Sequence, residues 1–157
     1  MSTAAPGRRN LASAAGPPPE LAGRLGYLLK HAQLGLAELT AAALEPYGLT
    51  GRELAVLTVL ASGEPASQQQ AAQRLGVDRT TMVALVDVLE DKGLVQRHAH
   101  AEDRRRNVVE LTEKGRDRLH QAGAAAQEAE SRFVAPLSRK DAQRLKAALL
   151  AVIQPEG

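Results

Sequence analysis

The sequence predicts a mainly α-helical fold with one small β-hairpin. Hydrophobic residues make up 44% of the 157 residues but aromatic residues only 2%, so the core must be built from Leu, Val and Ala. Such a core suits closely packed helices better than a sandwich or barrel. Apolar residues recur at three- and four-residue spacing along most of the chain, and only two short segments, 94–97 and 107–111, look like strands. The length indicates one domain.

Composition excludes several classes of site. The chain has 20 basic and 18 acidic residues, a net charge of +2, so the position of the charges must decide whether it binds nucleic acid. It has no cysteine, which excludes disulfides and thiolate metal sites. No apolar run approaches the roughly 20 residues that span a membrane, and no continuous apolar segment follows Arg8 and Arg9 as in a signal peptide. We therefore expect a cytoplasmic protein.

The first helix is predicted from Glu20 to about Glu45, before Pro46. Residues 1–19 are rich in Ala, Ser, Gly and Pro and are expected to form a disordered arm. The apolar residues of this helix recur at helical spacing and should lie on one stripe: Leu21, Leu25, Leu28, Leu29, Ala32, Leu36, Leu39 and Ala43.

Two capping boxes begin the next helices. Thr50 with Glu53 opens a helix that should break at Ser62 and Gly63. Ser67 with Gln70 opens a short helix, which Gly76 is suited to end.

Asp78 can cap a third helix, which should stop at Lys92 and Gly93. Its apolar stripe is Met82, Leu85, Val86 and Leu89. Paired strands are then predicted at Leu94–Arg97 and Asn107–Leu111. In the second strand, alternation should turn Val109 and Leu111 inward and Val108 and Glu110 outward.

Thr112 can cap a long helix that continues to Pro136. Gly115 stands where a full capping box would have Glu. Ser138 with Asp141 opens the last helix, and no internal repeat is seen.

The two helices separated by Gly76 and Val77 form a helix-turn-helix, whose second helix can enter a major groove. On that helix, Thr80, Ala84 and Asp87 should point away from the core, with Arg79 and Val83 on the flanks. Arg79 could bond a guanine edge and Val83 could touch a thymine methyl. Thr80 and Thr81 could bond phosphates or bases.

The loop of the hairpin is basic, with four arginines between residues 97 and 106. At the tip of a two-stranded wing, such arginines could reach the narrow minor groove. Asp103 could brace Arg105 by a bidentate pair. The predicted DNA contacts are Ser67, Gln68, Arg79, Thr80, Thr81, Val83, Ala84, Arg97, Asp103, Arg104, Arg105 and Arg106.

Each of these features has an alternative explanation. A charge cluster alone is usually a solvated turn, and a two-helix motif alone also occurs in proteins that bind no DNA. Their conjunction within about 45 residues favours DNA binding. A winged-helix module that binds protein remains an alternative. An enzyme is not expected, because no Gly-rich phosphate loop, His-x-x-x-His pair or Gly-x-Ser-x-Gly elbow is present.

Five segments resemble the MarR family of transcriptional regulators: Leu49–Glu53, Val77–Val83, Leu89–Val95, Asp103–Arg105 and Leu111–Gly115. The resemblance covers residues from about 20 to the end. It implies a winged helix-turn-helix homodimer that binds a pseudo-palindromic operator and usually leaves it when a small molecule enters. It also matches Asp103 and Arg105 to the wing's brace and minor-groove arginine. The chain departs from the family at Ala84 and Val88, where basic residues are common.

The resemblance divides residues 20–157, a single domain, into three parts. Residues 20–46 and 113–154 are expected to be dimerisation helices, and residues 50–112 the DNA-binding lobe. The apolar faces of the terminal helices are too extensive for one small winged domain to cover, which favours an isologous dimer interface. We expect the partners to be double-stranded DNA, a second copy of the chain and a small-molecule effector that releases a repressor, with no membrane and no cofactor.

The family outline also suggests where an effector would lie, between the dimer helices and the DNA-binding lobe. The candidate residues for that pocket are Tyr27, His31, Tyr47 and Arg52. A zinc-responsive regulator is an alternative, because alternation would put His98 and His100 on one face. Only Glu102 stands nearby as a third ligand, so no metal site is predicted.

Overall fold

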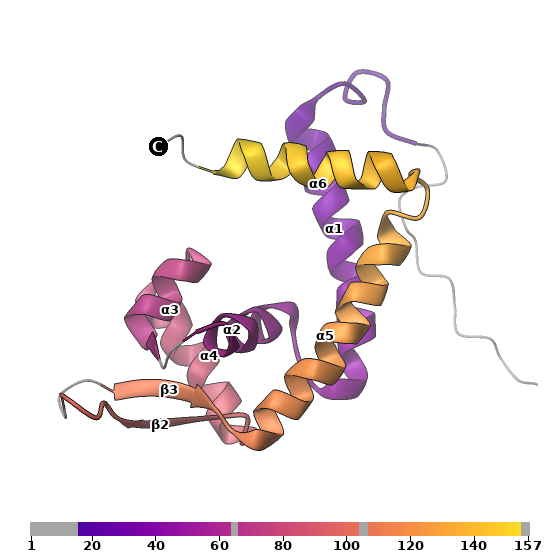
Figure 1. Cartoon of the computed structure of the whole chain (residues 1–157). Helices are drawn as coiled ribbons and strands as arrows, with labels where there is room; N and C mark the ends of the chain where they lie inside the picture. Colours follow the sequence, from indigo (N-terminus) through magenta and orange to yellow (C-terminus); the bar gives the residue numbers. More distant parts are fainter. Residues whose placement is uncertain (1–15, 64–65, 104–106, 155–157) are drawn as a thin grey trace, which may run out of the picture.

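The computed structural model describes residues 16–63, 66–103 and 107–154, and it is mainly helical with one small sheet (Figure 1). The elements in chain order are α1 (Leu25–Leu44), the 3-10 turn η1 (Glu45–Tyr47), α2 (Gly51–Ala61), β1 (Ala66–Ser67), α3 (Gln68–Leu75), α4 (Arg79–Asp91), β2 (Val95–Ala99), β3 (Asn107–Leu111), α5 (Glu113–Phe133) and α6 (Arg139–Ile153). The predicted fold class is confirmed. The predicted arm at 1–19 lies almost wholly outside the described residues.

The molecule has two parts. Helices α2, α3 and α4 and the sheet form one lobe, here called the central lobe, from which the β2–β3 hairpin, here called the wing, projects (Figure 1). Helices α1 and α5 run side by side next to this lobe, and α6 lies at the end of the molecule away from the wing. No helix within the described residues is long and apolar enough to cross a membrane.

The core lies in the central lobe and is aliphatic. Helices α2 and α4 supply most of its large fully buried side chains, and α1, β3 and the turn before β2 add the rest: Leu44, Val56, Leu57, Met82, Val86, Leu89, Leu94 and Val109. The apolar stripe that periodicity predicted on α4 is therefore buried, except that Leu85 is half-buried.

The helix boundaries follow the predicted caps. Thr50 and Ser67 each accept a hydrogen bond from the backbone three residues later, and their boxes are complete. Asp78 and Ser138 cap α4 and α6 in the same way. Gly76 ends α3 in the left-handed conformation at φ 65°, which glycine adopts without strain.

The start of α1 differs from the prediction. The helix begins at Leu25 rather than Glu20, because Leu21 and Ala22 both donate to the Pro18 carbonyl in a separate turn. Arg24 is extended, at φ −89° and ψ 112°, and this separates the turn from the helix.

The sheet has three antiparallel strands in the order β1–β3–β2, one more than predicted. The added strand β1 pairs Ala66 with Val109 and Ser67 with Val108. The prediction that Val108 faces outward is wrong, because it is 4% exposed. As a residue of the central strand it lies between Ser67 on one side and His98 on the other.

Candidate nucleic-acid interface

Helices α3 and α4 and the turn between them form the predicted helix-turn-helix. The Asp78 carboxylate accepts from the Thr81 backbone at 2.9 Å and from the Thr81 hydroxyl at 2.6 Å. These bonds from Thr81 lower the pKa of Asp78, so the cap stays charged. These bonds fix the first turn of α4. The Thr81 hydroxyl donates its hydrogen to Asp78 and is not available to donate to a ligand.

The exposed residues along α4 include Arg79, Thr80 and Ala84, as predicted for residues that lie outside the core stripe. Val83 is half-buried beside them. Asp87 is also exposed on this helix, so a carboxylate shares the surface with Arg79.

One cavity of about 490 Å³ brings several predicted residues together. It lies where α3, α4 and the wing meet, and its walls are Ser67, Gln68, Gln69, Arg79, Val83, Arg97 and Asn107. Five of these residues are predicted DNA contacts. Gln69 and Asn107 are not, because nothing in the spacing of the sequence shows that the start of α3 and the start of β3 lie together.

Arg97 is the predicted contact whose placement differs most from expectation. Its guanidinium bonds the carboxylates of Asp87 and Glu90, both on α4. Burial of the guanidinium disfavours its charge, but the bonds to Asp87 and Glu90 outweigh burial and raise the pKa of Arg97. The side chain therefore joins the wing to α4, whereas the sequence predicted that it would contact DNA.

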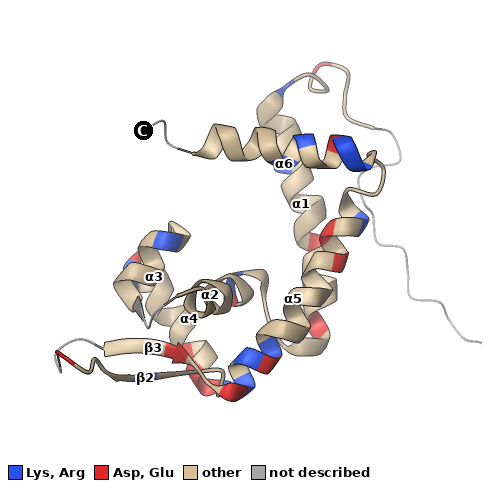
Figure 2. Ribbon diagram, in the orientation of Figure 1, with Lys and Arg blue, Asp and Glu red and all other residues tan. Residues whose placement is uncertain are grey.

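The charges at the base of the wing are mixed. Figure 2 shows acidic segments where β3 and the C-terminal part of α4 approach the start of α5, next to basic residues on α5. Asp103 is exposed in the wing loop. Arg104, Arg105 and Arg106, and with them the predicted brace from Asp103, lie outside the described residues.

The two wing histidines each have a partner in the protein. His98 Nε2 lies 3.4 Å from Glu110 Oε2, and His100 Nδ1 accepts from the Glu102 backbone at 3.2 Å. Across residues 16–63, 66–103 and 107–154, no three His, Cys, Asp or Glu side chains are grouped as metal ligands.

The predicted effector residues are not brought together. Tyr27 and His31 contact each other on α1, with ring centroids 4.1 Å apart. Arg52 lines a different place, an apolar cavity of about 650 Å³ between α1 and the start of α2. Its other walls are Gln33, Leu36, Ala37, Thr40, Ala41, Leu49, Thr50 and Gly51. Tyr47 lines a third cavity, of about 380 Å³, with Lys92, Lys114 and Arg118.

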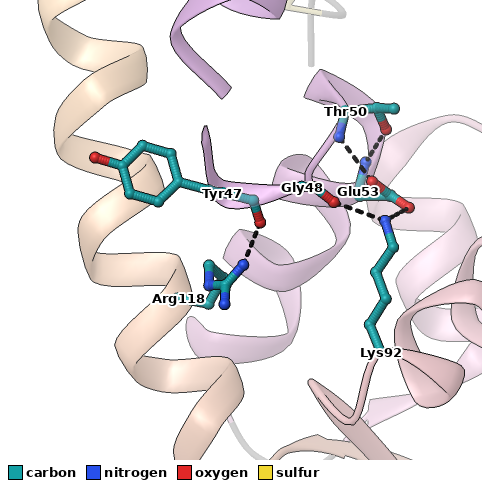
Figure 3. A network of polar contacts seen from close by, with 6 residues as sticks. All are labelled: Tyr47, Gly48, Thr50, Glu53, Lys92 and Arg118. Carbon is teal, nitrogen blue, oxygen red and sulfur yellow. Dashed lines mark hydrogen bonds and ion pairs between the residues drawn. The ribbon is translucent and has the colours of Figure 1, made fainter. Parts of the chain in front are cut away.

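A polar network that the sequence did not indicate connects the central lobe to α5 (Figure 3). Lys92 Nζ donates to Glu53 Oε1 at 2.7 Å and to the Gly48 carbonyl at 2.8 Å. The Arg118 guanidinium, on α5, donates to the Tyr47 carbonyl. Each cation thus satisfies a carbonyl at the end of η1, so the network fixes the junction between the lobe and the long helices.

Glu53 lies at the centre of this network and is 4% exposed. Burial would raise the pKa of its carboxyl, but the bonds from Lys92 and from Thr50 outweigh burial, and the pKa is lowered. The side chain is therefore held as a carboxylate.

The chain is similar to known regulators. A sequence profile of the MarR family matches residues 47–106. A proposed transcriptional regulatory protein for the hcr operon of Thauera aromatica is 33% identical over 125 residues, which are 79% of this chain and 74% of that protein. The solved structure of the transcriptional repressor CouR bound to a 23-mer DNA duplex is 34% identical, with a TM-score of 0.82 over 87% of this chain and 96% of that one.

A second structure, CouR from Rhodococcus jostii RHA1 bound to p-coumaroyl-CoA, is 28% identical. Its TM-score is 0.78, over 89% of this chain and 99% of that one. The hcr regulator and CouR are named as transcriptional regulators, which agrees with the expectation that this chain is not an enzyme.

Proposed function

Because the chain belongs to the MarR family of transcriptional regulators, we propose that it is a homodimeric repressor that binds a pseudo-palindromic operator. In this proposal a small-molecule effector releases the repressor. The protein acts in the cytoplasm, where the operator DNA is found.

The observation that carries the DNA-binding proposal is the cavity between α3, α4 and the wing. Ser67 at the end of β1, Gln68 of α3, and Arg79 and Val83 of α4 converge there, although up to 16 positions separate them in the chain. Polar and cationic groups beside one apolar contact are what a major groove edge requires. Asp78 strengthens this arrangement because it fixes the helix turn that carries Arg79. On the sequence resemblance, Arg105 acts in the minor groove with Asp103 as its brace.

The exposed apolar residues of α1 and α6 support a dimer. Leu25 is 67% exposed, and Ile153 and Val152 near the end of α6 are 74% and 79% exposed. Also exposed are Leu28, Leu29 and Leu34 of α1, Leu145, Leu149 and Leu150 of α6, and Leu21 just before α1. A surface of this kind is usually covered by a partner, and two copies could cover it for each other by two-fold symmetry.

The cavity between α1 and α2 supports an effector with an apolar body and an acidic group. Leu36, Ala37, Ala41 and Leu49 supply its apolar walls, and Arg52 is the one cationic side chain among its lining residues. CouR, a structural relative, binds p-coumaroyl-CoA, which combines an aromatic acyl group with phosphates. Aromatic acids and their thioesters are therefore the effector class to test first.

Selection from random duplexes tests the proposal. Purified protein is incubated with a random-sequence pool, and bound fragments are sequenced through successive rounds. We expect enrichment of one motif with two-fold symmetry, and release of that duplex when an aromatic acid or its thioester is added. A pool that stays random would contradict sequence-specific binding. An enriched motif without symmetry would contradict the dimeric operator.

A further inference from the structure

Arg97 joins three elements at the base of the wing. It lies on β2, paired with Val109 of β3, and its guanidinium bonds Asp87 and Glu90 of α4. Its backbone N–H also donates to Glu90 Oε1 at 3.3 Å. With the amide oxygen of Gln68 turned toward the guanidinium, Arg97 donates to it from Nε at 2.7 Å and from Nη2 at 3.0 Å, which adds α3.

These contacts occupy four of the five N–H donors of the guanidinium. Nε faces Gln68, Nη1 faces Glu90, and Nη2 faces both Asp87 and Gln68. The Arg97 side chain is only 22% exposed, compared with 57% for Asp87 and 40% for Glu90. A phosphate that approaches Arg97 therefore meets two partly exposed carboxylates around one cation. The side chains of Arg97, Asp87 and Glu90 together carry a charge of −1.

The wing needs an attachment of this kind. A two-stranded hairpin is marginally stable by itself, and β1, which extends the sheet, is only two residues long. Asp87 and Glu90 are three residues apart, so both lie on the face of α4 that meets β2. Because one planar guanidinium bonds both carboxylates, it fixes the angle between β2 and α4 as well as the distance between them.

We propose that Arg97 is a positioning residue that sets the wing against α4 through Asp87, Glu90 and Gln68. The wing and α4 can then engage the operator together. It does not serve as a phosphate ligand. This inference rests on the proposed function, because it concerns how the same surface distinguishes its operator from other DNA.

The test uses Asp87→Asn/Glu90→Gln in the full chain, with the duplex selected by the wild type and a scrambled duplex of equal length. The change removes two negative charges next to the DNA surface and leaves Arg97 in place. If Arg97 were a phosphate ligand, freeing it would tighten binding to both duplexes. We expect instead that operator affinity falls about tenfold or more while affinity for scrambled DNA stays equal or rises.

Two further variants separate the explanations. Glu38→Gln/Glu128→Gln removes two exposed acidic charges from α1 and α5 and should keep the wild-type preference for the operator. Arg97→Gln should weaken operator binding without changing the slope of log K against log salt concentration. Loss of one phosphate contact would instead reduce that slope by about 0.9. Melting temperatures of all variants show whether each is folded, and Asp87→Asn alone replaces the double variant if that one unfolds.

The outcomes are distinct. Equal or tighter operator binding by folded Asp87→Asn/Glu90→Gln, or a reduced salt slope in Arg97→Gln, would overturn the positioning role. A wild-type protein that prefers no duplex would overturn the proposed function itself.

Discussion

Replacement of Gly115 by alanine tests how α5 is attached to the central lobe. Gly115 lies in the first turn of α5, where its N–H donates to the Thr112 hydroxyl at 3.0 Å. A Cβ at this position would lie 1.9 Å from the Leu94 carbonyl oxygen. Ordinary van der Waals contact begins at 3.4 Å, so the two backbones would have to separate by about 1.5 Å.

That separation is opposed on the side of Leu94. The residue is 1% exposed, and its carbonyl accepts from the Thr112 backbone at 3.0 Å. Overpacking costs about 1–3 kcal/mol, and loss of that hydrogen bond about 1 kcal/mol more. Alanine regains about 1 kcal/mol through its helix propensity. We expect Gly115→Ala to lower the free energy of unfolding by about 1–3 kcal/mol.

Urea denaturation at fixed protein concentration measures this change, because a dimer's stability depends on concentration. Gly123→Ala is the matched control. Gly123 lies on the same helix, and a Cβ there meets nothing within 4 Å, so this variant should be as stable as the wild type or more so by about 0.5–1 kcal/mol. Equal stability of Gly115→Ala and Gly123→Ala would refute the close contact between α5 and Leu94.

Three further predictions concern the polar groups. Lys92→Met leaves the buried Glu53 carboxylate without its cation and should cost about 2–3 kcal/mol in urea denaturation. Adding Glu53→Gln should recover part of this loss, and a double variant no better than Lys92→Met would contradict the pairing. The pKa of Glu53 is lowered below its ordinary 4.5, so the network's stabilisation is present above that pH and is lost as pH falls through the folded value. Between about pH 5 and pH 3, the wild type should therefore lose more stability than Glu53→Gln. Asp78→Ala should weaken operator binding severalfold while Asp78→Asn, which can still cap α4, should not. Equal affinity of the two variants in a binding titration would count against this role of the cap.

Local sequence signals predicted most of the helices. The side chains of Thr50, Ser67, Asp78, Thr112 and Ser138 each cap the helix that they were expected to open. A capping box is decided by residues three positions apart, so the sequence contains all the information needed.

Features that depend on distant neighbours could not be predicted in this way. Strand β1 is two residues long, too short for any alternation, and exists because Ser67 meets Val108. The same pairing explains why Val108 is buried although alternation placed it outside. The start of α1 could not be predicted, because apolar spacing continues through Leu21 while the backbone turns at Pro18.

In the candidate site, too, local features could be predicted from the sequence and contacts between distant residues could not. Arg79 and Val83 could be predicted because helical spacing alone separates them from the core stripe. The role of Arg97 could not, because its partners Asp87 and Glu90 are selected by the angle between β2 and α4. Contacts such as that between Arg118 and the Tyr47 carbonyl join residues 71 positions apart, which no spacing in the sequence indicates.

Binding of wild-type and Arg79→Ala protein to the selected operator and to a scrambled duplex tests the central claim most directly. Fluorescence anisotropy at one fixed salt concentration gives both affinities. We expect the wild type to prefer the operator by about a thousandfold or more, and Arg79→Ala to lose about tenfold or more of that preference. Equal binding of both duplexes by the wild type, or an undiminished preference in Arg79→Ala, would contradict recognition of DNA by the tip of α4.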